Sequence, residues 1–289
     1  MWIVFACGSA LFAGITAVLA KEGIRTTDST VATALRTVVV LAGAWGMVFI
    51  VGSQAELAHL DARSTGLLVL SGLATGASWL CYFKALQLGS VSKVVPIDKL
   101  STVLTVLLAL IFLGERVSLI GALGVVLIAV GTLLMLDADD LRGLPRAVRD
   151  GRGWLLYALG SAFFAALTAI LGKAGITGVE SNLGTAIRTG VVLVMAWVMV
   201  AVTGKLRAVR AVPRGELGFV LASGAATCAS WLCYYRALQD GPASVVVPID
   251  KLSVLVTVLF SALVLRESVS RRYLVGLALL VGGTLAMVL

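Results

Sequence analysis

The sequence predicts an all-α polytopic membrane protein with ten transmembrane helices, arranged as two inverted five-helix repeats. Three observations support this prediction: the composition, the long apolar segments, and the repetition of the first half in the second. The chain has 289 residues, of which 60% are hydrophobic and 13% charged, and its mean hydropathy is +1.04. Ordinary soluble domains carry about 25% charged residues. A soluble core could not bury this much apolar surface, so lipid is the expected solvent.

Ten apolar segments follow one another along the chain, and most reach the roughly 20 residues that span a bilayer. The first segment lacks the basic stretch of a signal peptide, so it is expected to remain as a spanning helix. A transmembrane barrel would need alternating segments of about 10 residues, and none occur. In chain order, the segments lie near residues 2–20, 30–51, 66–88, 93–113, 118–136, 154–172, 182–204, 217–239, 245–265 and 272–289.

The two halves of the chain are copies of each other. Adding 152 to a position in the first half gives its partner, so that Arg36 matches Arg188 and "SWLCYFKALQ" matches "SWLCYYRALQ". This repetition predicts a first five-helix repeat at 1–136, a polar linker at 137–153 and a second repeat at 154–289.

Equivalent loops of the two halves carry different charge. The loop "GSQAELAHLDARS" has one Arg and no Lys, whereas its counterpart "TGKLRAVRAVPRGE" has four Lys and Arg residues in total. Positive loops collect on the cytoplasmic side of a membrane, so equivalent loops of opposite charge should face opposite sides. An odd number of helices per repeat gives the same result. The sequence therefore predicts an inverted-topology repeat, which is common in secondary transporters.

The octapeptide "VVPIDKLS" occurs twice in apolar sequence, at 94–101 and 246–253. If the fourth helix began after the first copy, it would be too short to span, so the motif is predicted to lie inside the membrane. Pro96 and Pro248 each remove one helix hydrogen bond and should kink their helices. A kinked backbone with ionisable side chains at this depth predicts the lining of a polar cavity, with one wall from each repeat.

Buried charges in a membrane need partners, because an unpaired one costs about 2.5 to over 10 kcal/mol. Arg36 and Arg188 are the candidate partners of Asp98 and Asp250. Such pairs either lock helices together or handle a substrate or proton, and the sequence leaves both open. The lysines of the motif can extend to the headgroups instead, and the aromatic "SWLCY" stretches can contact a substrate or form an interfacial belt. The residues predicted to line the substrate or proton pathway are Asp98, Asp250, Arg36, Arg188, Lys99, Lys251, Pro96, Pro248, Trp79, Trp231, Tyr82, Tyr234, Ser101 and Ser253.

Several functions have no support in the sequence. There is no Walker or G-x-S-x-G motif and no Cys/His set with metal-ligand spacing, so neither an enzyme nor a cofactor or metal is predicted. Four Cys residues suggest no disulfide framework. The net charge of +8 comes from basic residues in short loops, which fits lipid headgroups rather than nucleic acid. The predicted partners are membrane lipid and a small-molecule substrate, and the predicted state is a monomer or homodimer.

The third segment of each half ends in the pattern Y-x-A-L-x-x-G, seen as "YFKALQLG" and "YYRALQDG". A proline within the next segment and a glutamate at a tight turn follow, at Pro96 and Glu115 and again at Pro248 and Glu267. With these features, nearly the whole chain resembles two fused EamA domains of the drug/metabolite transporter superfamily. The resemblance implies ten helices, a central cavity near the midplane, alternating access, and small organic substrates that are often exported. "PIDKLS" is more charged than the usual family pattern.

The predicted function is secondary transport of a small organic metabolite or drug-like solute across the plasma membrane, with possible proton coupling. A channel and a non-transporting scaffold or regulator are the alternatives. A channel would need a continuous polar stripe along several helices, whereas the polar residues cluster near the level of the motif. In a scaffold, Asp98 and Asp250 would only hold helices together.

The distribution of basic residues predicts the orientation in the membrane. The odd-numbered loops hold fifteen Lys and Arg residues and the even-numbered loops four, which places the odd loops in the cytoplasm and both termini outside. The family resemblance implies the reverse. We expect a C-terminal reporter that is active only in the cytoplasm to stay silent, and activity of that reporter would contradict the charge-based orientation.

Overall fold

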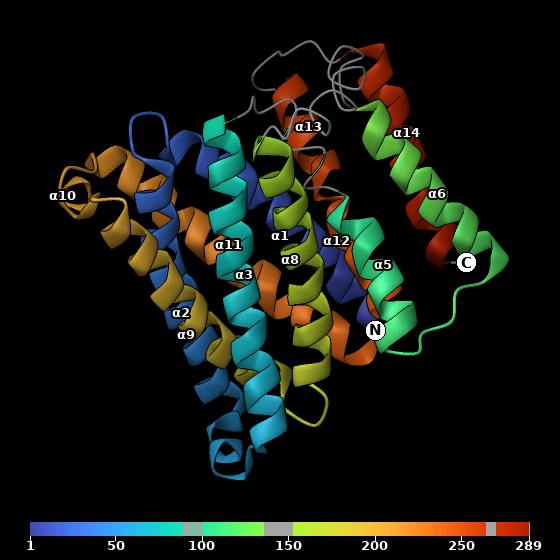
Figure 1. Ribbon diagram of the computed structural model, residues 1–289. Helices are drawn as coiled ribbons and strands as arrows, with labels where there is room; N and C mark the ends of the chain where they lie inside the picture. Colours follow the sequence, from blue (N-terminus) through green and yellow to red (C-terminus); the bar gives the residue numbers. More distant parts are fainter. Residues whose placement is uncertain (89–93, 95–96, 98–99, 136–152, 264–269, 289) are drawn as a thin grey trace.

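The computed structural model describes residues 1–88, 94, 97, 100–135, 153–263 and 270–288 of the chain. The regular elements in these ranges are all helical (Figure 1). They are α1 (Trp2–Gly23), α2 (Ser29–Val51), the short 3-10 helix η1 (Ser53–His59), α3 (Ala62–Leu88), α5 (Ser101–Phe112), α6 (Leu119–Leu134), α8 (Gly153–Gly175), α9 (Ser181–Val202), α10 (Leu206–Val209), α11 (Arg214–Asp240), α12 (Ala243–Lys251), α13 (Ser253–Leu263) and α14 (Arg271–Val288).

Seven of these helices are long and apolar enough to cross a membrane, namely α1, α2, α3, α8, α9, α11 and α14. The helices α5 and α6 are apolar but shorter, and the ninth predicted segment is divided into α12 and α13. An all-helical fold with multiple membrane spans is therefore confirmed for the described residues. The predicted count of ten spans stays a prediction.

Acidic side chains define where several helices begin. Asp28 accepts hydrogen bonds from the second and third amides beyond it and starts α2, and Glu180 does the same for α9. The helix α3 begins four residues before the predicted segment, where the amide of Ser64 donates to Asp61 at 3.0 Å. These caps satisfy amides that have no partner within the helix.

The main helix contacts join one repeat to the other. The helix α1 packs against α11, α3 against α8, α2 against α9, and α6 against α14. The first pair is antiparallel, because Gly8 lies against Cys233 and Gly23 lies against Val220. The pair α3 and α8 has the same contacts at positions shifted by 152. Exchanging the repeats thus reproduces the packing, as a two-fold axis requires.

Helix directions show that the repeats are inverted. The helix α3 runs parallel to α9, since Gly72 faces Val191 and Gly76 faces Met195, and α11 runs parallel to α2 through the equivalent glycine contacts. The helices α2 and α9 are antiparallel, because the first half of each packs against the second half of the other. It follows that α3 and its copy α11 point in opposite directions along the bundle.

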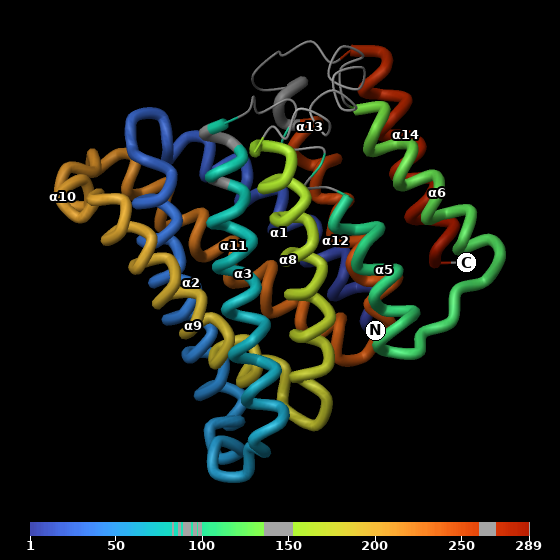
Figure 2. The backbone as a smooth tube through the Cα atoms, viewed as in Figure 1, coloured from blue at the N-terminus to red at the C-terminus, as the bar shows by residue number. Residues whose placement is uncertain are grey.

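The helices α6 and α14 approach each other especially closely and lie side by side at one edge of the bundle (Figure 2). A Cβ atom on Gly131 would lie 2.5 Å from the carbonyl oxygen of Gly276, and one on Gly124 would lie 2.5 Å from that of Gly283. Small residues allow close helix packing in a bilayer, where lipid removes the hydrophobic drive for association. Glycine is therefore required at this crossing by backbone contact.

Small and hydroxylated residues fill the inside of the bundle, and large apolar residues cover much of the outside. Ser9, Ser71, Ser161 and Thr189 are completely buried, whereas the Val202 side chain is 82% exposed on the outer surface. An outer surface of this kind fits contact with acyl chains.

Both termini lie at the same end of the bundle (Figure 1). Trp2 packs against Gly241, while Met287 packs against Gly124 at the start of α6. The loops after α1 and α9 meet at the other end, where Lys205 forms an ion pair with Asp28 at 2.7 Å. Basic residues of these loops thus gather at the end opposite the termini.

We expect Gly131→Ala to lower the stability of the protein by about 1–3 kcal/mol, since the new methyl group would press on backbone atoms of α14. Gly46→Ala on α2 is the matched control, because a Cβ there meets no atom within 4 Å. That variant should be neutral, or more stable by about 0.5–1 kcal/mol. Thermal unfolding of both purified variants in detergent measures the difference, and equal midpoints would contradict the close α6–α14 contact.

Candidate functional site

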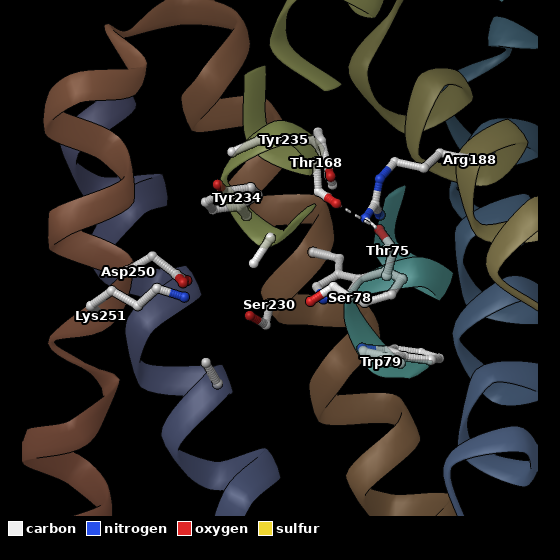
Figure 3. A pocket seen from close by; sticks show the side chains of 14 residues that line it. Thr75, Ser78, Trp79, Thr168, Arg188, Ser230, Tyr234, Tyr235, Asp250 and Lys251 are labelled. Atoms are coloured by element: carbon white, nitrogen blue, oxygen red, sulfur yellow. Dashed lines mark hydrogen bonds between the residues drawn. The ribbon is translucent and has the colours of Figure 1, made fainter. Parts of the chain in front are cut away.

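A cavity of about 270 Å³ lies inside the bundle, between helices of both repeats. Figure 3 shows that side chains from α3, α9, α11 and α12 converge on it. Polar and charged groups share its wall with four aromatic rings. The lining residues are Ala13, Thr75, Ser78, Trp79, Ala165, Thr168, Ala169, Arg188, Ser230, Trp231, Tyr234, Tyr235, Asp250 and Lys251.

Arg188 supplies a buried positive charge to this cavity from the first half of α9, and the residue is only 3% exposed. Its Nε donates to the Ser71 hydroxyl at 3.0 Å, and its Nη2 donates to the Thr75 hydroxyl at 2.6 Å. The guanidinium carbon lies 4.9 Å from the ring centre of Trp231 and 4.8 Å from that of Tyr235. The remaining nitrogen, Nη1, is buried and has no hydrogen-bond partner among the described residues.

Asp250 and Lys251 reach the cavity because α12 ends at this point. Pro248 has no amide hydrogen to donate. The amide of Leu252 then bonds to Ile249, three residues back, at 2.9 Å, and α13 starts at the next residue. In place of the kink predicted at Pro248, the helix is interrupted at Leu252, inside the motif and four residues after the proline.

The first repeat breaks at the equivalent position. The amide of Leu100 bonds to the Ile97 carbonyl at 3.1 Å, and α5 begins at Ser101. A 3-10 bond of this kind inside a helix often marks a functional hinge. The motif therefore produces the same local break in both halves.

Asp250 is held by the opposite repeat. The Ser9 hydroxyl on α1 donates to its Oδ1 at 2.5 Å, and Ser230 of α11 donates to the Ser9 carbonyl at 3.1 Å. The predicted pairing of Asp250 with Arg188 does not occur, since no ion pair joins these two described residues. They face the cavity from opposite sides instead (Figure 3). Hydroxyl groups and aromatic rings contact the guanidinium in place of the carboxylate, and Nη1 keeps no hydrogen-bond partner among the described residues.

Arg36 lies elsewhere, although it is the copy of Arg188. It lines a second cavity of about 180 Å³ with residues of α1, α2 and α11, including Ser29 and Ser223. No hydrogen bond or ion pair of Arg36 occurs within the described part of the chain. In this structure the two arginines therefore line different cavities, and the predicted role of Arg36 in a shared pathway stays a prediction.

The other predicted residues divide into three groups. Trp79, Trp231, Tyr234 and Lys251 line the central cavity together with Arg188 and Asp250. Tyr82, Ser101, Ser253 and Pro248 belong to described helices but do not line it; Tyr82 packs on the cluster around Val94 and Ile97. Pro96, Asp98 and Lys99 lie outside the described residues. The predicted role of all these residues stays a prediction.

Several lining residues escaped the sequence prediction, namely Thr75, Ser78, Thr168, Ser230 and Tyr235. One signal could have found the first two, since Ser71, Thr75 and Ser78 follow each other at helical spacing and share one face of α3. The hydroxyl of Thr168 on α8 lies 3.3 Å from that of Thr75 on α3. Tyr235 stands where the first repeat has Phe83, a difference that marks the halves as unequal.

A polar clamp holds the corner between α11 and α12, just before the motif. Glu115 of the first repeat accepts hydrogen bonds from the amides of Ala243 at 2.7 Å and Ser244 at 2.8 Å. Lys173 donates to the carbonyl of Leu238 at 2.7 Å and to that of Gly241. These bonds satisfy backbone groups at the end of one helix and the start of the next.

Comparisons with known proteins agree with this architecture. The model of a family described as "EamA-like transporter family" matches residues 1–137 and again residues 152–289. An "Uncharacterized transporter in cobO 3'region" from Sinorhizobium sp is 46% identical over 134 residues, which are 46% of this chain and 95% of that protein. A solved structure titled "Crystal structure of protein" has a TM-score of 0.73 at 19% identity, over 99% of this chain and 95% of the other. This last likeness concerns the fold alone.

We expect Glu115→Ala to destabilise the protein by about 0.5–2 kcal/mol, as the loss of other helix caps does. The amides of Ala243 and Ser244, which are both buried residues, would lose their acceptor. Glu22→Ala is the matched control, because the partner of Glu22 is the exposed Arg25 and surface pairs contribute little. Thermal unfolding in detergent compares the two, and an equal effect would show that the clamp is dispensable.

Proposed function

Because the chain belongs to the EamA-like transporter family, we propose that it is a secondary transporter that moves a small organic solute by alternating access. Its partners are then membrane lipid and the solute, and its site is the plasma membrane. We further propose ten spans, of which the fourth and ninth are broken helices. The opposite directions of α3 and its copy α11 support this inverted arrangement.

The observation that carries this function is the central cavity. It holds Arg188, Asp250 and Lys251 inside a bundle whose outer surface is apolar. Ionisable groups at such depth are costly, and in membrane proteins they mark substrate or ion pathways. The cavity is also lined by both repeats, so that a relative movement of the repeats would change access to it.

A difference between equivalent contacts supports two states. Arg188 joins α9 to α3 through its bonds to Ser71 and Thr75. The equivalent hydroxyls, Ser223 and Thr227, donate to carbonyls of their own helix and do not bind Arg36. The helices α9 and α3 are therefore joined by hydrogen bonds of Arg188, whereas α2 and α11 lack the equivalent bonds of Arg36. In the alternate state the two repeats would exchange these arrangements, which opens the cavity toward the opposite side.

The carboxylate of Asp250 is the group that we propose for proton coupling. It lies beside the break between α12 and α13 and is held by Ser9 of the other repeat. Protonation would remove its charge and weaken this bond, because a charged acceptor binds a hydroxyl more strongly than a neutral one. A proton could thus bias the contact between the repeats. A purely structural role for Asp250 is the competing explanation.

Counterflow of radiolabelled small organic solutes into liposomes that contain the purified protein tests the function. We expect saturable, protein-dependent accumulation, and a slowing by about tenfold or more in Asp250→Asn, with loss of its pH dependence; tenfold corresponds to about 1.4 kcal/mol. Asn keeps the shape of the side chain and an acceptor for Ser9.

Asp240→Asn, at an exposed pair with Arg236, is the charge-matched control and should transport normally. Flux that never saturates would indicate a channel, and no flux of any solute would indicate a scaffold. Unchanged rates and unchanged pH dependence in both Asp250→Asn and Asp98→Asn would leave the aspartates as structural residues.

A further inference from the structure

We propose that the central cavity binds the carboxylate group of a small organic monoanion at Nη1 of Arg188, with the apolar body of that anion against the aromatic rings of the cavity. This proposal rests on the proposed transport function and adds to it a chemical class of substrate and the atom that recognises it.

The first argument is the incomplete hydrogen bonding of Arg188. A guanidinium has five donors in a rigid fork and no acceptor. Ser71 and Thr75 accept from Nε and Nη2, while Nη1 is buried without any partner among the described residues. A buried donor without an acceptor is costly, and such groups call for a specific explanation. Since Arg188 lines the cavity, a bound acceptor would provide one.

The second argument is charge. Among the described residues that line the cavity, Arg188 and Lys251 are cations and Asp250 is the single carboxylate. Asp250 does not pair with Arg188 and is bound by Ser9 instead. One positive charge therefore remains uncompensated by this lining. A ligand that carries one negative charge restores neutrality in a medium where an unpaired charge is expensive.

The third argument concerns the rest of the ligand. Four rings line the cavity, those of Trp79, Trp231, Tyr234 and Tyr235. Two of them, Trp231 and Tyr235, already lie within 5 Å of the guanidinium carbon. An apolar body attached to the carboxylate would therefore meet aromatic faces next to the arginine. Pockets that are lined by aromatic side chains and contain a few precisely positioned polar groups are typical of small-molecule sites.

The position of Arg188 also distinguishes a soluble ligand from a lipid headgroup. The residue lies in the first half of α9 and is 3% exposed, with its guanidinium bonded to α3 and lying over rings of α11. A phosphate anchored in the headgroup layer by its acyl chains is held away from such a buried site, whereas a freely diffusing solute is not. Binding should therefore persist in an uncharged detergent without added lipid.

Four matched probes test the proposal by isothermal titration of the purified protein in dodecyl maltoside. They are 3-phenylpropionate, 3-phenylpropionamide, 2-phenylethylamine and acetate. We expect 3-phenylpropionate to bind about tenfold to a hundredfold more tightly than the amide, the range expected for a charge-assisted hydrogen bond. It should also exceed the amine, which carries the opposite charge, and acetate, which lacks the apolar body.

Arg188→Lys keeps the charge and removes the fork, and it should weaken 3-phenylpropionate binding by about tenfold or more. Arg236→Gln removes an exposed arginine of α11 and should bind like the wild type. If Arg188→Lys does not fold, the probe series on the wild-type protein still decides the matter. Equal binding of carboxylate and amide would overturn the proposal. Tightest binding of the amine would also overturn it and point to Asp250 as the anchor.

These outcomes are separable from those of the transport assay. If the wild type binds 3-phenylpropionate through Arg188 but liposomes show no counterflow of any solute, the carboxylate site stands and the transport function fails. If other solutes show counterflow while 3-phenylpropionate does not bind, the transport function stands and the carboxylate site is wrong.

Discussion

The antiparallel crossing of α1 and α11 is the interaction on which the cavity depends. Ser230 donates to the Ser9 carbonyl, and Ser9 donates to Asp250. The same short chain of hydroxyls therefore joins two helices and positions the acid of the motif. Small side chains make this contact possible, because only they allow two helices to approach closely enough for a serine to reach the opposite backbone. The equivalent crossing of α3 and α8 repeats the bond between Ser78 and Ser161 at 3.1 Å. A larger residue at either crossing would separate the repeats that form the cavity.

Duplication gives each repeat the same local interruption of its backbone hydrogen bonding. The amides of Leu100 and Leu252 each bond to the carbonyl three residues back, and α12 packs against α5. A break exposes backbone groups that lipid cannot satisfy, so it is tolerated only where protein or a polar cavity surrounds it. The relative from Sinorhizobium sp matches about half of this chain over nearly its whole length, as expected if one repeat corresponds to one such protein.

The two halves are no longer equivalent, and the difference concentrates at the arginines. Arg188 lies over Trp231 and Tyr235 and binds two hydroxyls, whereas Arg36 occupies a separate cavity without such bonds. Part of this difference is encoded, because Phe83 stands at the position of Tyr235. Part of it is conformational, because Ser223 and Thr227 are present and simply bond elsewhere. Contacts that form in one repeat and are absent from its copy are compatible with the proposed mechanism, in which the two repeats alternate between these arrangements.

Composition, segment length and the 152-residue offset were sufficient to predict a helical, membrane-spanning protein made of two repeats. A helix that crosses lipid needs about 20 consecutive apolar residues, and both such segments and their repetition can be read from the sequence. They also predicted that Asp250, Lys251 and Arg188 face a polar cavity, because ionisable groups inside a membrane are costly unless they face one. These residues line the central cavity, and their role stays a prediction. Only the tertiary structure decided which groups contact Arg188. The sequence predicts a carboxylate as its partner, but hydroxyls of α3 and rings of α11 lie closer in space. The spacing of residues along one helix does not determine the distance to a neighbouring helix. The separate cavity of Arg36 follows from the same cause, since it depends on which helices surround that side chain.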